Sequence, residues 1–339
     1  MNDKRILVWG AGAIGGTIGA YLARAGREVM FVDIAKDHLK RIEAGQLRID
    51  GPGIDFTTGG HTATPDSVEG TYNLILLAVK IQDTENATRA LHPHLAADGC
   101  VVSCQNGLAS RVVAEIIGRD RTLAAAMFLP ADWIAPGNIT YSGRTSFYIG
   151  ELDGRLTERL HQVVAVFRDF DAGVKASDDI FGNIWGKMAL GVLLGASALT
   201  NETRVEFFSQ PDRIPLIGGL VREVLRTAAA DGYKAHDSDW FRSDAFLSKD
   251  DNAVRQSIAT LVEVSRNSPK VHSGYWRDLA VRRRPTELPA QFEPMVAIAE
   301  KHGIPVPLTK HFLALIGDIE ADRKEIGIPL IKELMASAS

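Results

Sequence analysis

The chain has 339 residues, which is enough for two domains and a large core. Its 38 basic and 42 acidic residues leave a net charge of -4. The basic run Arg282-Arg283-Arg284 is too short for a polyanion-binding patch, so we expect no nucleic-acid partner.

The targeting segments and the cysteines indicate the cellular compartment. A predicted strand begins almost at once, with no signal peptide, and no apolar run approaches the length that crosses a bilayer. We therefore expect a cytoplasmic protein with no membrane partner. Cys100 and Cys104 have the same-face spacing of one strand, which favours two buried thiols over a disulfide or a metal site.

Residues 6–33 form the most informative stretch. The apolar residues 6–9 predict a strand, residues 17–25 a helix ended by Gly26, and residues 28–32 a second strand with Asp33 at its tip. Between the first strand and the helix lies the G-x-G-x-x-G motif, and we expect all its residues to bind a dinucleotide: Gly10, Ala11, Gly12, Ala13, Ile14 and Gly15.

Each glycine of this motif has a physical purpose. The first glycine permits a tight turn, the second lets a pyrophosphate approach the backbone, and the third lets the helix pack against the strand. Asp33 can accept hydrogen bonds from the adenosine ribose and would repel a 2′-phosphate, so we predict NAD(H) in preference to NADP(H). A glycine-rich turn in an unrelated α/β protein is the alternative, and the agreement of strands, helix and acid argues against it.

The rest of the first half continues the α/β pattern. We predict helices at 37–44, 82–91 and 156–170, a hairpin at 47–58, and strands at 74–79, 99–104, 122–127, 138–142, 146–150 and 174–176. The sequence therefore predicts a Rossmann dinucleotide-binding domain at residues 1–177.

Two polar residues follow buried strands at their carboxyl ends, where ligands of open parallel sheets bind. Lys80 fits either a residue beside a cofactor or anionic substrate, or a solvent-facing lysine that opens a helix. Asn106, in an Asn-Gly turn, is either a turn residue or part of the same rim.

Residues 178–339 show helical periods, at 179–200, 213–232, 252–264, 289–303 and 308–320. We predict an all-α second domain for substrate binding and dimerisation, with Trp240, Phe241 and Phe246 as candidates for a homodimer face. In the first of these helices, Asn183, Lys187, Gly191 and Gly195 share one face. Interior glycines cost about 1 kcal/mol each relative to alanine. They indicate either a groove for a substrate beside Lys187 or close helix packing with the lysine reaching solvent.

The ordered motifs resemble the ketopantoate reductase family over nearly the whole chain. They are the glycine loop, Val79-Lys80, Asn106-Gly107, Ile184-Trp185-Gly186-Lys187, Ser273 to Asp278 followed by Thr286-Glu287, and His302-Gly303-Ile304-Pro305-Val306-Pro307. The resemblance implies hydride transfer between NAD(P)H and the carbonyl of a 2-oxo acid. It also implies that Lys187 is the general acid, that Glu287 orients the substrate, that Asn106 bridges cofactor and substrate, and that Lys80 adds positive charge near both.

Departures from the family pattern concern the substrate. Gly191 and Gly195 stand where the family usually has asparagines that hold the substrate, Gly274 replaces a serine after Ser273, and Phe292-Glu293 replaces an Asn-Gly pair. Unpaired buried groups cost about 1 to 3 kcal/mol each, so we expect a bulkier or more apolar substrate than ketopantoate, with Tyr275 and Trp276 as pocket walls. The expected substrate-binding residues are Lys187, Gly191, Gly195, Ser273, Trp276 and Glu287.

The cofactor and the class of protein leave alternatives. Most family members prefer NADP and carry a basic residue near the end of the second strand, whereas this chain has Asp33-Ile34. An opine-type or β-hydroxyacid dehydrogenase, or a dinucleotide sensor without chemistry, are the other classes that fit the amino-terminal half.

Overall fold

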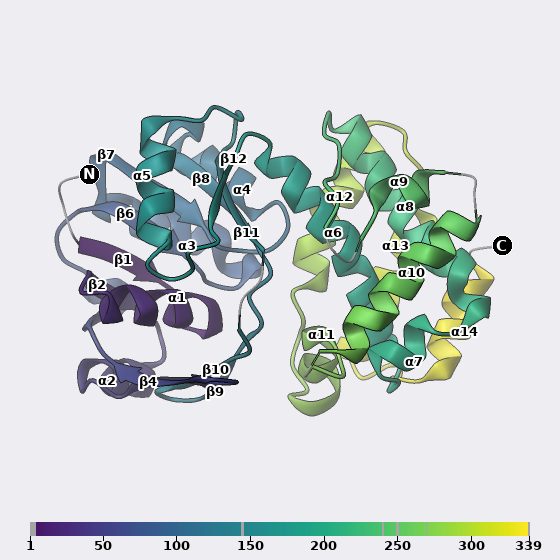
Figure 1. Cartoon of the computed structure of the whole chain (residues 1–339), viewed down its shortest axis with the longest axis horizontal. Coiled ribbons are helices and arrows are strands. Elements are labelled where there is room, and N and C mark those ends of the chain that lie inside the picture. Colours follow the sequence, from purple (N-terminus) through teal and green to yellow (C-terminus); the bar gives the residue numbers. More distant parts are fainter. Residues whose placement is uncertain (1–4, 144–145, 239–240, 249–250, 269, 338–339) are drawn as a thin grey trace. The chain divides into compact units, whose positions relative to one another are not determined.

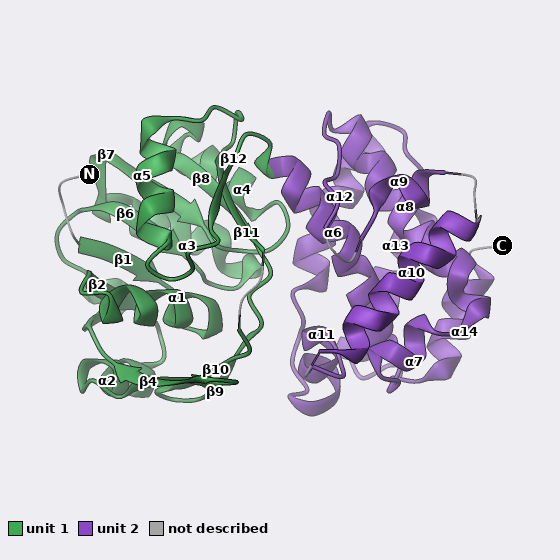
Figure 2. Ribbon diagram, in the orientation of Figure 1, with its two compact units in different colours: residues 1–180 green, residues 181–339 purple. Residues whose placement is uncertain are grey.

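The computed structural model describes residues 5–143, 146–238, 241–248, 251–268 and 270–337. It divides into two compact units, residues 1–180 and residues 181–339 (Figure 2). The first unit is an α/β sheet domain and the second is helical, which confirms the predicted fold class.

Unit 1 is built on an eight-stranded sheet in the order β12-β11-β8-β7-β6-β1-β2-β5 (Figure 1). The strands are β1 (Arg5–Trp9), β2 (Glu28–Val32), β5 (His61–Ala63), β6 (Tyr72–Leu77), β7 (Leu95–Ser103), β8 (Thr122–Met127), β11 (Phe147–Glu151) and β12 (Lys175–Ser177). The pairs from β5 to β8 are parallel, whereas β11 pairs antiparallel with β8. The carboxyl ends of β1, β6 and β7 therefore meet at one edge of the sheet.

Alternate residues of each central strand enter two different cores. Ile6 and Val8 of β1 pack with residues of α1 (Ala13–Arg24) and α5 (Glu158–Phe167). Leu7 and Trp9 pack with residues of α3 (Thr84–Leu91) and α4 (Ala109–Ile117). Because both faces are covered, the strands carry near-continuous apolar runs, as expected for a buried parallel sheet.

A second, four-stranded sheet in unit 1 has the order β4-β3-β10-β9. Its strands are β3 (Leu47–Gly51), β4 (Ile54–Thr58), β9 (Ala131–Ala135) and β10 (Asn138–Tyr141), and α2 (Lys36–Glu43) precedes it in the chain. The hairpin predicted at residues 47–58 is confirmed by the antiparallel β3–β4 pair. Strand β9, like β5 of the larger sheet, was not predicted.

Unit 2 contains α6 (Ile180–Ala196), which begins at the unit boundary, and eight further α-helices among its described residues. These are α7 (Arg204–Phe208), α8 (Ile214–Ala230), α9 (Ser243–Leu247), α10 (Asp251–Arg266), α11 (Gly274–Trp276), α12 (Leu288–Lys301), α13 (Pro307–Glu320) and α14 (Ile328–Ala336). The five long helices confirm the predicted ones, and α7, α9, α11 and α14 were not predicted.

The expectation that no apolar run approaches membrane-spanning length was wrong for one segment. Among the described residues, the helical segment Ile180–Leu199 passes that test by length and composition. However, 83% of its apolar window is buried inside the fold. Trp185, Met188 and Val192 are fully buried, so this helix belongs to the core of unit 2.

The aromatic residues expected at a dimer face have other positions. Phe241 and Phe246 are 2% and 1% exposed, and their rings stack with centroids 5.2 Å apart. They belong to the core of unit 2, so the dimer-face assignment is wrong for both. Trp240 lies outside the described residues.

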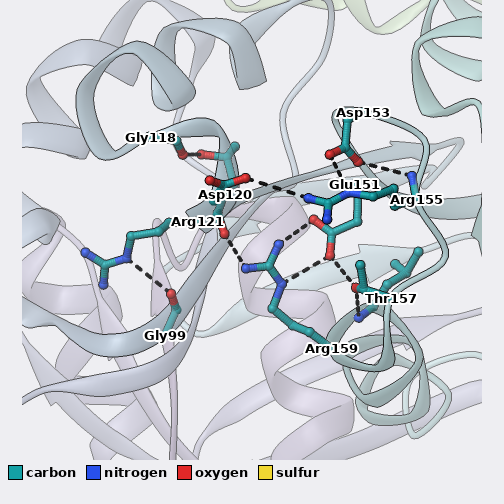
Figure 3. A network of polar contacts seen from close by, with 11 residues as sticks. Gly99, Gly118, Asp120, Arg121, Glu151, Asp153, Arg155, Thr157 and Arg159 are labelled. Carbon is teal, nitrogen blue, oxygen red and sulfur yellow. Dashed lines mark hydrogen bonds and ion pairs between the residues drawn. The ribbon is translucent and has the colours of Figure 1, made fainter.

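A polar network joins the end of β11, the start of α5 and the segment before β8 (Figure 3). It centres on Glu151 at the end of β11, whose side chain is 4% exposed and forms an ion pair with Arg159. Thr157 Oγ1 and Arg159 Nε also donate to Glu151 Oε1, at 2.6 and 3.1 Å. Arg159 further donates to the carbonyl of Asp120, just before β8. The network thus fixes α5 and the antiparallel strand to the parallel part of the sheet.

We expect replacement of Glu151 by glutamine to lower the free energy of unfolding by about 2 kcal/mol, because it leaves the arginine without its buried counter-charge. Arg155→Gln is the matched control, since its ion pair with Asp153 is exposed to solvent and should contribute much less to stability. Denaturant unfolding of both variants measures this difference. Equal effects of the two substitutions would contradict the structural role of Glu151.

Candidate functional site

The glycine loop between β1 and α1 is shaped by close contacts. Gly10 has a φ of +98°, and a Cβ there would lie 2.7 Å from the backbone nitrogen of Val79. A Cβ on Gly15 would lie 2.0 Å from the carbonyl oxygen of Gly10. At Gly12, in contrast, a Cβ would meet nothing within 4 Å. The loop is therefore tight on its protein side and has open backbone at Gly12, as a bound pyrophosphate requires.

Asp33 is held rigidly beside this loop. Its Oδ2 accepts a hydrogen bond from the backbone N–H of Ala11, and its Oδ1 accepts one from Ala35, both at 2.9 Å. The next side chain, Ile34, is 83% exposed. The tip of β2 thus presents a fixed carboxylate and an apolar side chain, and Asp33 also orders the glycine loop.

A buried histidine that the sequence did not single out supports the same loop. His38 in α2 is 1% exposed, its Nδ1 accepts from the backbone N–H of Gly137 at 2.9 Å, and its Nε2 lies 2.8 Å from the carbonyl oxygen of Ala11. Since an amide N–H only donates, Nδ1 carries no proton and Nε2 donates to Ala11. The ring therefore links the glycine loop to the turn between β9 and β10.

The loops after β6 and β7 are joined by Gln105. Its Nε2 donates to the carbonyl of Val79 at 3.1 Å and to Thr84 Oγ1 at 2.7 Å, and its Oε1 accepts from Ser103 Oγ at 3.2 Å. Lys80 is exposed and Asn106 is half-buried, each next to a residue of this network. The structure therefore places Lys80 and Asn106 at the sheet edge that also carries the glycine loop, and Gln105 positions both turns.

In unit 2, Lys187 lies on α6 and is half-buried. Desolvation lowers the pKa of Lys187 to about 8, and the carboxylate of Glu287 opposes this shift. The fold therefore brings these two groups, one hundred positions apart in the chain, close enough to interact electrostatically. A lysine with a pKa near neutrality is suited to proton transfer at physiological pH.

Glu287 is placed by a contact between two helices. It is the residue before α12, and its neighbour Thr286 donates from both its backbone nitrogen and Oγ1 to Oε1 of Glu320, at 2.7 and 2.8 Å. Thr286 Oγ1 in turn accepts from the backbone N–H of Leu288 at 3.2 Å. The start of α12 is thus fixed to the end of α13. Glu320 was missed in the sequence because it lies 34 positions away in an ordinary helical pattern.

The two glycines of α6 have different surroundings. A Cβ on Gly195 would lie 2.7 Å from Phe312 Cζ and 2.8 Å from Leu288 Cδ2, and both side chains are fully buried. Gly195 therefore permits close packing of α6 against Leu288 and Phe312. A Cβ on Gly191 would lie 3.1 Å from Gln291 Nε2 and 3.7 Å from Phe292 Cζ. The space beside Gly191 is thus occupied by a polar side chain and an aromatic ring.

The predicted pocket residues before α12 have defined partners within unit 2. Ser273 is buried and caps α11, because its Oγ accepts from the backbone N–H of Trp276 at 3.2 Å. Trp276 donates from Nε1 to Asn201 Oδ1 at 3.1 Å and stacks on His272, with ring centroids 3.9 Å apart. Tyr275 donates instead to Gln291, on the helix that Glu287 precedes.

Comparison with known proteins gives the same picture for both halves of the chain. The model of the ketopantoate reductase PanE/ApbA family matches residues 6–154, and that of the ketopantoate reductase PanE/ApbA C-terminal region matches residues 179–320. The 2-dehydropantoate 2-reductases of Archaeoglobus fulgidus and Halobacterium salinarum are each 28% identical. The matches cover 69% and 75% of this chain and 77% and 86% of those proteins.

Solved structures resemble the chain over nearly its full length. A PanE/ApbA family ketopantoate reductase from Ralstonia eutropha is 26% identical, with a TM-score of 0.79, over 95% of this chain and all of that one. D-mandelate dehydrogenase, solved with NADH and anilino(oxo)acetate, is 18% identical and shares the fold with a TM-score of 0.82 over 94% of this chain and 99% of that one. The chain therefore belongs to the ketopantoate reductase PanE/ApbA family of nicotinamide-dependent oxidoreductases.

Proposed function

We propose that the protein is an NAD(H)-dependent 2-oxo acid reductase, or 2-hydroxyacid dehydrogenase, whose substrate is less polar than ketopantoate. The observation that carries this proposal is the desolvated Lys187, with a pKa of about 8, beside Glu287. These are the residues to which family resemblance assigns proton transfer and substrate orientation. An opine-type or β-hydroxyacid dehydrogenase would use another catalytic set, so turnover that survives removal of Lys187 would favour that alternative.

The residues of unit 1 fit a dinucleotide. Open backbone at Gly12, at the start of α1, suits a pyrophosphate, and the fixed carboxylate of Asp33 suits ribose hydroxyls. We propose that NAD(H) is preferred, because Asp33 repels a 2′-phosphate and the exposed Ile34 offers no charge to bind one. When bound, the dinucleotide donates or accepts the hydride. We further propose that Asn106 contacts both cofactor and substrate and that Lys80 adds positive charge.

Lys187 would hold and deliver the proton. With a pKa of about 8, the amine is mostly protonated at pH 7, so the ammonium can stabilise a developing alkoxide and then give its proton to that oxygen. In the reverse direction the neutral amine accepts the proton of the alcohol. Glu287 stabilises the charged form of the lysine, and we propose that this half-buried residue accepts a hydrogen bond from the substrate.

The surroundings of α6 favour a less polar substrate. Neither Gly191 nor Gly195 has a side-chain amide to bind a polar substrate group. The fully buried Phe292 lies beside Gly191. A bulky apolar side chain on the 2-oxo acid gains from contact with such a ring, whereas a second hydroxyl group gains less. We therefore expect branched aliphatic or aromatic 2-oxo acids to be better substrates than ketopantoate.

Steady-state turnover of purified protein tests the proposal. Ketopantoate, 2-oxoisovalerate and phenylglyoxylate would each be combined with NADH and with NADPH, and the absorbance of the reduced cofactor followed. We expect the highest kcat/KM with NADH and one of the two less polar acids. NADH binding without oxidation by any of the three would contradict the proposal and favour a dinucleotide sensor.

A further inference from the structure

The side chain of Gln291 lies against the position that a side chain at residue 191 would take. Gln291 is 2% exposed and lies in the first turns of α12, where its backbone N–H donates to the carbonyl of Glu287 at 2.9 Å. Its Nε2 lies 3.1 Å from the position of a Cβ built on Gly191. The absence of a side chain on α6 is therefore matched by the presence of an amide on α12.

A tyrosine fixes the orientation of this amide. The Oη of Tyr275 donates to Gln291 Oε1 at 2.7 Å, so the oxygen end of the amide faces the tyrosine and the nitrogen end faces Gly191. Burial, together with the charge of Glu287, raises the pKa of Tyr275, so the phenol stays protonated and remains a donor. The Nε2 group consequently presents N–H donors, and no acceptor, toward α6.

The location of the amide relates it to the proposed reaction. Gly191 follows Lys187 by one helical turn, and Gln291 follows Glu287 by one turn. The Nε2 donor thus lies one turn along α12 from Glu287, and it faces Gly191, which lies one turn along α6 from Lys187. Lysine and amide together supply donors for two different oxygens, as a 2-oxo acid offers in its ketone and its carboxylate.

We propose that Gln291 is a specificity-determining residue whose Nε2 binds the carboxylate of the substrate. The inference rests on the proposed function, and it names the group that takes over where an amide on α6 is missing. Because Nε2 only donates, it suits a carboxylate oxygen. The ring of Phe292, with its Cζ 3.7 Å from the same built Cβ, flanks this donor on the apolar side.

The test compares Gln291→Leu with the wild-type enzyme on the best 2-oxo acid of the panel above. Leucine keeps a similar volume but lacks the donor, so we expect KM for the 2-oxo acid to rise about 10- to 100-fold, the range for a hydrogen bond to a charged group. The kcat and the affinity for NADH should change less than about threefold. Tyr275→Phe should also raise KM, by a smaller factor, because the amide of Gln291 is kept but loses the hydrogen bond that orients it. Glu293→Gln, an exposed change on the same helix, is the matched control and should leave both constants unchanged.

An exchange of the amide between the helices separates binding from packing. In Gln291→Ala the space beside Gly191 is emptied, and adding Gly191→Asn returns an amide to it from α6. We expect Gln291→Ala to raise KM and the double variant to return KM most of the way to the wild-type value. Gly191→Asn alone should impair the enzyme, because the new side chain meets Gln291.

The outcomes distinguish this inference from the function on which it rests. If the wild-type enzyme reduces a 2-oxo acid and Gln291→Leu has the same KM, the role of Gln291 is overturned and the function stands. If Gln291→Leu only lowers Tm, or the double variant recovers nothing, the amide is structural and the inference is also overturned. If the wild-type enzyme reduces none of the acids, both fail.

Discussion

Replacing Lys187 by alanine should lower kcat by about 1,000-fold, within the range of roughly 100- to 10,000-fold that general acid catalysis contributes. In the proposed mechanism the variant loses both the proton that is transferred and the positive charge that stabilises the alkoxide. Its affinity for NADH, measured by fluorescence titration, should stay within a few-fold, because the glycine loop and Asp33 lie in unit 1 and Lys187 in unit 2. Retention of most of the turnover would show that another group transfers the proton.

The pH dependence of kcat should follow the protonation of Lys187, in opposite senses for reduction and for oxidation. In the proposed mechanism reduction needs the protonated lysine, so kcat for reduction should be constant at low pH and fall about tenfold per pH unit once the pH exceeds about 8. Oxidation of the 2-hydroxy acid needs the neutral amine and should rise with pH up to the same value. Lys187→Arg is the control, because arginine stays charged throughout and should remove the inflection. An unchanged inflection in this variant would assign it to another group.

The double variant Asp33→Ser, Ile34→Arg should shift the ratio of kcat/KM for NADPH over NADH by about 100-fold toward NADPH. The change removes a carboxylate and adds a guanidinium, which forms strong charge-assisted hydrogen bonds with phosphate. Steady-state kinetics with each cofactor at a fixed 2-oxo acid concentration measures the ratio. A wild-type enzyme that already prefers NADPH would contradict the argument.

Asp33 also orders the loop, and single variants separate the two roles. Asp33→Ala leaves the backbone N–H groups of Ala11 and Ala35 without their acceptor, so it should weaken the binding of NADH and of NADPH together. Ile34→Arg keeps these hydrogen bonds and should strengthen the binding of NADPH alone. Equal behaviour of the two variants would mean that loop order and cofactor choice are not separable here.

The parallel core of unit 1 was predictable because it depends on local patterns. Buried strands such as β6 and β8 carry uninterrupted apolar runs, and the glycine loop follows β1 directly. Strand β9 was missed because it pairs only with β10, at the edge of the small sheet, and its five residues include no buried one. Short helices such as α7 were missed because five residues are too few to show a helical period.

The candidate site was only partly predictable. Lys187 and Glu287 were found from motifs, which keep their order along the chain. The partner of Gly191 was not found, because helical periodicity shows that a glycine faces inward but not which side chain fills the space. The same limit explains the error at Phe241 and Phe246, since aromatic residues on helices suit an interface and a core equally well.

The contrast between the two glycines of α6 also constrains how this enzyme can change its substrate range. A side chain at position 195 meets two fully buried apolar groups, Leu288 and Phe312, so it is tolerated only after both neighbours have become smaller. At position 191 the obstacle is the end of one flexible side chain, Gln291, which a second substitution removes. Directed evolution should therefore reach new specificities through paired changes at 191 and 291, while position 195 stays closed by epistasis.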